Sequence, residues 1–536
     1  MQDKKTTFIE RLDKPTTIVS FGVTALFFLW GMTAGDSLGT VMKATLGLLT
    51  NTFGWILLIM GLLLVGMALW LAFGPYSHVK IGPDDAKPEF STFSWFAMLF
   101  TAAYGVGLTY WGPAEPLTFY VNPPIGLPPQ TTAAAEVGMA WSFSHWGIVP
   151  WAIFLCYTVA IGYFVYRKGR PLRYSSALPD SIRLAHNGLI AQIIDGLMVA
   201  AMILSCMTAI GFGVKQLAAG LANQFNLEVS VTMYMIIAVI WIALYGFSAI
   251  SGIYKGIKLL SSINMYLAFI LLGFVLFFGP TAFIGNIFTT AMGEYLDRFF
   301  KMSLWTDAID QGGFPQGWTI FYWAWWTACI PSIAAFCTRV SYGRTFRELV
   351  MAFMVLATIS TWIWFAAFGG TAIWMETKGG FDMVGPLKEG GADVVVYSLF
   401  NNLPLSGLTI PLFIVLVVIF LATTADAISY NCATLCTGPK GNVQNPSKIL
   451  RGLWAIILGA GAVTLIIQGE GISAIQMSSV AACSYCVVFY MISMWYLVKD
   501  LRENENTRFV TIVPVKTKND NNPIREIPGT TLSKYS

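Results

Sequence analysis

Long apolar runs recur along this chain, and they constrain its fold more than any other feature of the sequence. A helix of about 20 apolar residues crosses the hydrocarbon core of a bilayer and satisfies its own backbone hydrogen bonds there. Twelve such runs predict an all-α membrane protein with twelve transmembrane helices. The predicted spans are residues 16–35, 52–74, 92–112, 137–165, 190–219, 230–250, 258–279, 317–338, 349–373, 407–435, 450–468 and 472–498.

Charged residues are scarce along the whole chain. They make up 11% of the 536 residues, whereas soluble domains carry about 25%. This scarcity excludes a disordered chain and a large soluble domain on a single anchor. The net charge of +4 does not indicate a nucleic-acid-binding surface. The sequence contains neither a Walker-type phosphate loop nor a nucleophile paired with a base. We therefore expect that the protein is not driven by ATP, is not an enzyme and uses no cofactor.

Basic residues are distributed unequally between the two sides of the predicted membrane. Of the 32 Lys and Arg, 26 lie in the two tails and the alternate loops, and five lie in the opposite loops. Loops rich in Lys and Arg remain in the cytoplasm. Both termini are therefore expected to be cytoplasmic.

The outer loop at residues 280–316 mixes charged and apolar residues at helical spacing. This pattern predicts a helix lying in the membrane interface, in contact with lipid. A loop helix packed on its own subunit is the alternative. The tail from Lys499 onward is rich in charge, Pro and Asn and is read as flexible.

The densest aromatic cluster lies at the start of the eighth span, at Trp318, Tyr322, Trp323, Trp325 and Trp326. At 100° per residue, Trp318, Tyr322 and Trp325 fall on one helix face, with Trp326 at its edge. Tryptophans also form belts at membrane interfaces, but a belt needs no such column. A column of rings suits a permanent cation, because each ring face attracts positive charge by roughly 0.5 to 2 kcal/mol.

The fourth span carries a second aromatic pair, Trp146 and Trp151, beside Gly and Pro residues that loosen a helix. These tryptophans either line a site or pack. His145 is interpreted as a hydrogen-bonded packing residue rather than a proton carrier.

The third and tenth spans carry further candidates. Gly105 and Gly107 allow the third span either to unwind and offer backbone groups to a ligand or to pack closely on another helix. Thr423 and Thr424 place two hydroxyl groups deep in an apolar run, next to Asp426. Oxygen ligands suit sodium, although Thr also commonly bonds the carbonyl four residues earlier.

Several motifs together resemble the betaine/carnitine/choline transporter family. They are Gly317-Trp-Thr-Ile-Phe-Tyr-Trp-Ala-Trp-Trp, Arg339-Val-Ser-Tyr-Gly-Arg-Thr, Gly112-x-x-Glu-Pro, His145-Trp-Gly and Gly312-Gly-Phe-Pro-Gln-Gly. The resemblance implies a LeuT-like fold of two inverted five-helix repeats in a homotrimer. Its parts would be a cytoplasmic tail (1–15), two extra helices (16–91), the first repeat (92–279), the outer interfacial helix (280–316), the second repeat (317–498) and a cytoplasmic tail (499–536).

The resemblance also implies a substrate site and a sodium site. The substrate cage would comprise Trp146, Trp151, Trp325 and Trp326, flanked by Trp323 and Tyr322, with Trp111 and Trp318 on the outer approach and an unwound third-span segment at Tyr104, Gly105 and Gly107. Sodium would bind the Thr423 and Thr424 hydroxyls and the backbone of Ala103 and Tyr104.

Departures from the family pattern refine the expected coupling. The chain has Phe154 and Thr118 where glycine betaine symporters and carnitine antiporters, respectively, have Tyr. Asn264 and Ile333 replace the Arg and Met of the sodium-independent antiporters, which favours sodium coupling. A second sodium site would align with Ser205 and Ala209, so one hydroxyl is missing and one sodium is expected.

The expected function is therefore secondary transport across a prokaryotic cytoplasmic (inner) membrane by alternating access, coupled to sodium. Members that take choline tend to have Asp where this chain has Gly107. A trimethylammonium zwitterion, namely glycine betaine, carnitine or γ-butyrobetaine, is favoured. Sodium-independent exchange and choline uptake are the alternatives.

Overall fold

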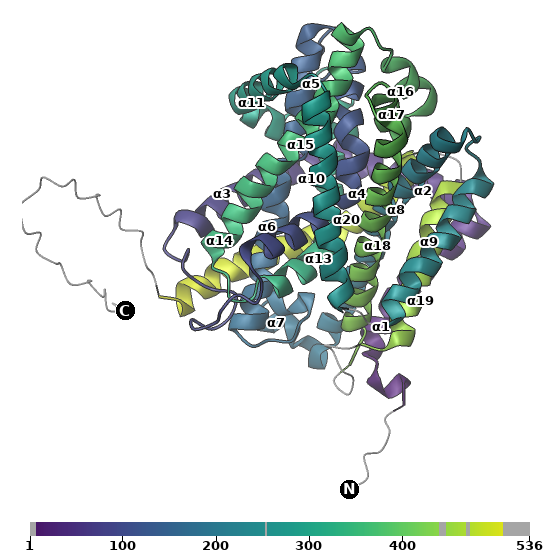
Figure 1. The fold of residues 1–536 in the computed structure, drawn as a ribbon. Helices are drawn as coiled ribbons and strands as arrows, with labels where there is room; N and C mark the ends of the chain where they lie inside the picture. The colour runs from purple at the N-terminus through teal and green to yellow at the C-terminus, as the bar shows by residue number, and fades with distance from the viewer. Residues whose placement is uncertain (1–6, 252–253, 439–445, 468–471, 507–536) are drawn as a thin grey trace, which may run out of the picture.

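The computed structural model describes residues 7–251, 254–438, 446–467 and 472–506 (Figure 1). Every regular element in these ranges is helical, and the only strand-like pairs in them are two isolated bridges, Leu12 with Thr437 and Lys80 with Thr345. This confirms the all-α class. Parts of both predicted tails, residues 1–6 and 507–536, lie outside the described residues.

The longer helices are α1 (Lys14–Thr33), α2 (Gly35–Gly47), α3 (Gly54–Phe73), α4 (Thr92–Val121), α5 (Thr132–His145), α6 (Ile148–Gly162), α8 (Leu189–Phe225), α9 (Val231–Ser251), α10 (Tyr254–Phe278), α11 (Thr281–Leu304), α13 (Thr319–Val340), α15 (Thr358–Trp374), α17 (Ala392–Asn401), α18 (Ser406–Leu435), α19 (Lys448–Ile467) and α20 (Ile472–Asn504). Short helices are α7 (Asp180–Arg183), α12 (Phe314–Gly317), α14 (Phe346–Val350) and α16 (Val384–Gly390). The remaining turns are η1 (Ile9–Arg11), η2 (Leu48–Thr52), η3 (Tyr163–Arg167), η4 (Tyr174–Ala177), η5 (Ala185–Gly188), η6 (Met351–Ala357) and η7 (Met375–Gly379).

The described residues include 9 helical segments that are long and apolar enough to cross a membrane, or 10 when the bent helix α4 is added. The chain is therefore an integral membrane protein. Each of the twelve predicted spans overlaps a helix, including α9 and α19, which are not among the nine. The number of twelve crossings and the inverted repeats stay predictions.

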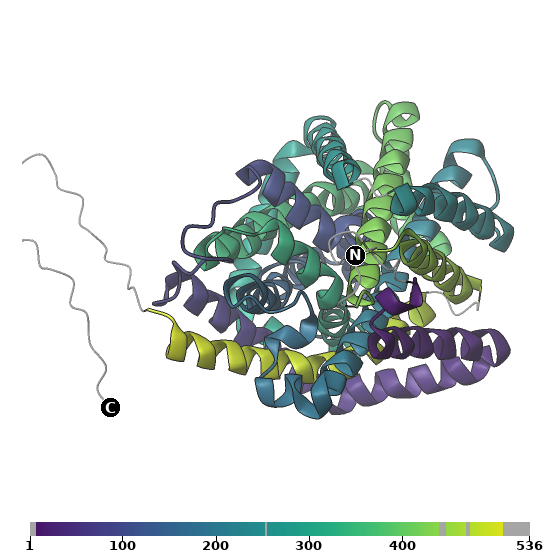
Figure 2. The same ribbon diagram turned by 90° about the horizontal axis from the view of Figure 1, so that it is seen from below.

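Both ends of the described chain meet the same loop, which joins α6 to α8. Asp13 forms an ion pair with Arg173 at 2.7 Å, and Glu505 forms one with Arg167 at 2.6 Å. In the view from below, α20 runs along one edge of the bundle to reach this loop (Figure 2). The two ends therefore lie on one side of the helices.

Helix α11 occupies most of the predicted outer interfacial segment. Its buried residues Ile284, Ile287, Ala291 and Tyr295 recur at helical spacing and face α5 and α15. Leu296 and Phe300, by contrast, are exposed. The helix thus packs on its own chain along one face and presents apolar side chains on another.

Two irregular helices bring side chains to the centre of the bundle. The predicted fourth span is divided into α5 and α6 at Trp146 and Gly147. A Cβ atom at Gly147 would lie 2.3 Å from the Phe143 carbonyl oxygen, so glycine is required at this break. Helix α4 bends by 67° between Ala103 and Gly105. Helices α4, α6, α8 and α18 all pack against α13, which carries most of the predicted aromatic site.

Candidate functional site: an aromatic cage

Four aromatic rings from two helical segments gather beside α13, and we call them the four-ring cage: Trp146, Tyr322, Trp325 and Trp326. The Trp325 and Trp326 rings stack at 4.6 Å between centroids, and Tyr322 stacks on Trp326 at 5.5 Å. Trp146 meets the Trp326 ring edge-on at 5.0 Å. Each of the four side chains is at most 2% exposed. The arrangement gathers four rings in a water-excluded position, where the attraction between a ring face and a cation is strongest.

The absence of a side chain at Gly107 leaves room for the Trp146 ring. A Cβ atom at this position would lie 2.7 Å from Cη2 of Trp146 and 3.9 Å from Cη2 of Trp325. The position predicted to govern substrate charge thus directly adjoins the cage. Any side chain there would displace the Trp146 ring.

The third span bends by 67° between Ala103 and Gly105. Its backbone stays helical from Thr92 to Val121. A Cβ atom at Gly105 would lie 2.7 Å from the Phe420 ring, so this glycine allows α4 to approach α18 closely. Both glycines provide room for a neighbouring ring, and an unwound segment at Tyr104, Gly105 and Gly107 stays a prediction. The Tyr104 side chain lies outside the described part of the structure.

Trp151, predicted for the cage, and Trp323, predicted to flank it, are not among these four rings. Trp151 is one turn farther along α6, where it packs against Phe100 and Phe154 with ring centroids 6.1 Å away in each case. The Trp323 indole faces α3, since a Cβ atom at Gly61 would lie 3.0 Å from its Nε1. Successive residues on a helix point in different directions, and Trp323 therefore points away from Trp325 and Trp326.

The two residues predicted for the outer approach do contact each other. The Trp111 and Trp318 rings meet edge-on at 5.4 Å, and Trp318 lies 6.1 Å from Tyr322 of the cage. Trp318 is partly exposed, whereas Trp111 is buried. The pair covers the cage at the end nearest the α11–α12 segment.

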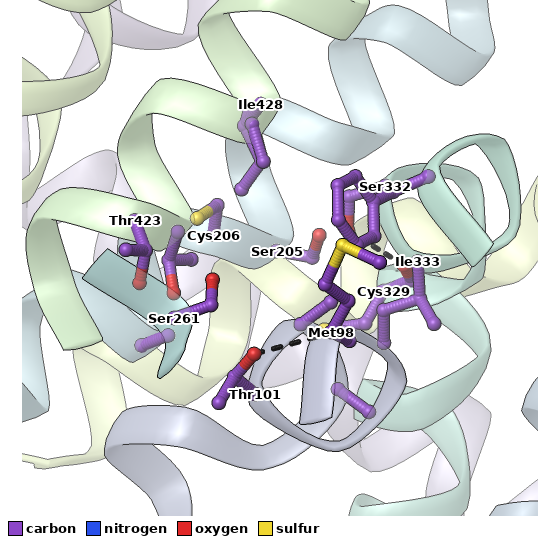
Figure 3. A pocket seen from close by; sticks show the side chains of 16 residues that line it. Met98, Thr101, Ser205, Cys206, Ser261, Cys329, Ser332, Ile333, Thr423 and Ile428 are labelled. Atoms are coloured by element: carbon purple, nitrogen blue, oxygen red, sulfur yellow. Dashed lines mark hydrogen bonds between the residues drawn. The ribbon is translucent and has the colours of Figure 1, made fainter. Parts of the chain in front are cut away.

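A cavity of about 70 Å³, with a mostly apolar wall that carries several hydroxyl groups, lies farther along α13, beyond the cage (Figure 3). Its hydroxyl groups come from five helices: Thr101 of α4, Ser205 of α8, Ser261 of α10, Ser332 of α13, and Thr423 and Thr424 of α18. Ala103 also lines it, so three of the four predicted sodium ligands border one cavity. Figure 3 shows Thr423 and Ser261 on one side of the cavity, and Ser332 and Ile333 on the other.

The chemistry of the cavity suits a hard cation. Hydroxyl and carbonyl oxygens are the ligands that such ions prefer. The Thr423 hydroxyl lies 2.9 Å from the Ile419 carbonyl oxygen, to which it donates. Donation uses the hydroxyl proton and leaves the oxygen lone pairs available to an ion. Ser205 and Ala209, the aligned residues of the second site, line the same cavity.

Sequence reasoning gave no role to Glu115, which lies behind the cage. Its carboxylate is fully buried. One oxygen lies 2.9 Å from Nδ1 of His145, and the other accepts hydrogen bonds from Nε1 of Trp146 at 2.7 Å and from the Tyr322 hydroxyl at 2.6 Å. The signal available in the sequence was an acidic residue at the end of an apolar run, because ionisable groups inside membranes are costly unless they serve a function.

Comparison with known proteins agrees with this architecture. The family model described as "BCCT, betaine/carnitine/choline family transporter" matches residues 15–506. The "Glycine betaine transporter OpuD" of Bacillus subtilis (strain 168) is 35% identical, over 90% of this chain and 94% of its own length.

Two further relatives match over similar lengths. The "Probable glycine betaine transporter" of Desulfitobacterium hafniense (strain Y51) is 33% identical, over 92% of this chain and 99% of its own. The "Ectoine/hydroxyectoine transporter" of Virgibacillus pantothenticus is 32% identical, over 92% and 97%. The match covers both the cage and the cavity, and its members are transporters rather than enzymes. This chain belongs to the betaine/carnitine/choline transporter family.

Proposed function

We propose that this protein is a secondary transporter that moves a trimethylammonium zwitterion, with glycine betaine as the first candidate, across the cytoplasmic (inner) membrane of a prokaryote. The observation that carries the proposal is the four-ring cage, in which Trp146, Tyr322, Trp325 and Trp326 provide buried ring faces. A quaternary ammonium group cannot donate hydrogen bonds, so ring faces are the partners that suit it. Two of the relatives are named as glycine betaine transporters.

The proposed preference for a zwitterion over choline rests on Gly107. A carboxylate at this position would supply a negative charge to a ligand that has no carboxylate of its own. Glycine supplies none, and a Cβ atom there would lie within 2.7 Å of the Trp146 ring. Carnitine and γ-butyrobetaine share the trimethylammonium group and are the other zwitterions to test.

The proposed driving ion is sodium, bound among the hydroxyl groups of the cavity beyond the cage. Thr423 and Thr424 would supply hydroxyl oxygens, and the backbone of Ala103 and Tyr104 would complete the site. The cavity follows the cage along α13, so an ion there would lie against α4 and α13, which also carry Gly107 and three of the four rings. Shared helices allow the binding of one ligand to favour the binding of the other.

The proposed assembly is a homotrimer with both termini in the cytoplasm and the apolar face of α11 against lipid or a second subunit. The exposed Leu296 and Phe300 support this role for α11. The 26 basic residues in the tails and alternate loops support the orientation.

Uptake into proteoliposomes tests the function. Radiolabelled glycine betaine, carnitine, γ-butyrobetaine and choline would be offered with or without an inward sodium gradient, to empty vesicles and to vesicles preloaded with substrate. Sodium-dependent accumulation of a zwitterion in empty vesicles is the expected result. Uptake only into preloaded vesicles, indifferent to sodium, would mean exchange instead. A Trp325→Leu/Trp326→Leu double variant in matched vesicles controls for leakage.

A further inference from the structure

The carboxylate of Glu115 connects three helical segments at the back of the four-ring cage. Glu115 lies on α4, His145 and Trp146 lie at the end of α5, and Tyr322 lies on α13. Its oxygens lie 2.9 Å from His145, 2.7 Å from Trp146 and 2.6 Å from Tyr322. Two of these partners are cage rings, so one side chain fixes the relative position of rings that are more than 170 residues apart in the sequence.

His145 extends the connection to a third ring. Nε1 of Trp326 donates to the His145 carbonyl oxygen at 3.2 Å, and Nε2 of His145 lies 2.9 Å from the Thr319 hydroxyl. A proton on Nδ1 of His145 would be donated to the Glu115 carboxylate, and Nε2 lies within hydrogen-bond distance of the Thr319 hydroxyl.

No Lys or Arg pairs with Glu115 in the part of the chain that the structure describes. The Trp146 indole can only donate, so the Glu115 oxygen that it contacts must accept. Inside a membrane such a carboxylate acts over a longer range than it would in water, since little solvent screens it. One Glu115 oxygen contacts both Trp146 and Tyr322, so the negative charge lies next to both rings.

On the basis of the function proposed above, we propose that Glu115 is a positioning residue for the cage and that its charge orients the substrate. It fixes Trp146 and Tyr322 by hydrogen bonds. Its charge draws the trimethylammonium group toward the rings and repels a ligand carboxylate, which therefore points away from Glu115. A cation without a carboxylate gains the attraction without the repulsion.

Three variants distinguish the two proposed roles of Glu115, which are to position the rings and to orient the substrate by its charge. For each variant, the dissociation constants of glycine betaine and choline are measured by quenching of tryptophan fluorescence. Glu115→Gln removes the charge and part of the hydrogen bonding. The dissociation constants of both ligands should therefore rise by about tenfold or more, as for loss of a hydrogen bond to a charged group. The dissociation constant of choline should rise by the larger factor, so the ratio of this constant to that of glycine betaine rises. Glu115→Asp keeps the charge at a changed distance, so both ligands weaken and the ratio changes little.

Tyr322→Phe keeps the ring and the charge but removes one donor. It is expected to raise the dissociation constants of both ligands by a similar factor. This variant tests the positioning role even if Glu115→Gln does not fold. Glu503→Gln, at the exposed end of α20, is the matched control and should bind like the wild type. Unchanged affinity in Tyr322→Phe would refute the positioning role, and an unchanged ratio in a folded Glu115→Gln would refute the orienting charge. If the wild type binds neither ligand, the proposed function fails first.

Discussion

The Cβ position of Gly107 lies 2.7 Å from Cη2 of Trp146, so a residue of α4 without a side chain adjoins a tryptophan ring of the cage. Contacts this short do not occur between real atoms without a shift of one partner. Trp146 has little freedom to shift, because its Nε1 is hydrogen-bonded to Glu115 and its ring meets Trp326. The size of residue 107 therefore controls the geometry of the cage.

Gly107→Ala should accordingly weaken glycine betaine binding. Adding a methyl group to a packed interior costs about 1 to 3 kcal/mol, which corresponds to roughly fivefold to 150-fold in the dissociation constant. Titration calorimetry on the purified protein measures the effect. Gly66→Ala on α3 is the control, because a Cβ atom there meets nothing within 4 Å. Equal affinity in the two variants would show that Trp146 is not held as described.

Replacing single tryptophans should distinguish the cage from its surroundings. Trp326→Leu removes a ring that stacks on both Trp325 and Tyr322, and it is expected to raise the dissociation constant of glycine betaine more than tenfold. Trp323→Phe changes a ring that faces α3 and should leave that constant within about twofold, since it alters packing only. Calorimetric titration of both variants provides the comparison. A loss in Trp323→Phe equal to that in Trp326→Leu would contradict the assigned orientation.

The helical class was predictable because few backbone conformations satisfy their own hydrogen bonds inside lipid. Backbone groups inside a bilayer must bond within their own helix, so apolar runs of sufficient length indicate helices directly. The interruption at Trp146 and Gly147 was less visible, because it depends on Phe143 and Trp362, which leave no room for a Cβ atom. A periodicity argument treats residues 137–165 as one span, whereas contacts with another helix divide it.

The site was predictable only in part for a related reason. The 100° rule placed Trp318, Tyr322 and Trp325 on one face, and their rings do follow one another at 6.1 Å and 6.0 Å. The rule says nothing of residues on other helices. The connection through Glu115 joins positions 115, 145 and 322, and only the packed fold brings these together.

Sodium coupling should depend on the hydroxyl groups of α18. Thr423→Ala combined with Thr424→Ala removes two hydroxyl oxygens and two methyl groups from the wall of the cavity. Sodium-driven uptake of glycine betaine is expected to fall at least tenfold at low sodium, because a hard cation loses two ligands. Initial uptake rates over a sodium titration measure this. Thr464→Ala is the control, because Thr464 makes the same bond to the carbonyl four residues earlier, at 2.9 Å, but lies on α19. Undiminished uptake in the double variant would exclude sodium binding at these residues.

The break between α5 and α6 should be intolerant of even one methyl group. A Cβ atom at Gly147 would lie 2.3 Å from the Phe143 carbonyl oxygen and 2.7 Å from Nε1 of Trp362, which itself donates to that carbonyl at 2.8 Å. Gly147→Ala must therefore move the backbone or break this hydrogen bond, at a cost of about 1 to 3 kcal/mol. The expected result is a lower melting temperature in detergent together with weaker glycine betaine binding, since Trp146 adjoins the break. Gly22→Ala on α1, where a Cβ atom meets nothing within 4 Å, should melt like the wild type. If Gly147→Ala melts at the wild-type temperature, the close contact with Phe143 does not set the path of the chain at Trp146.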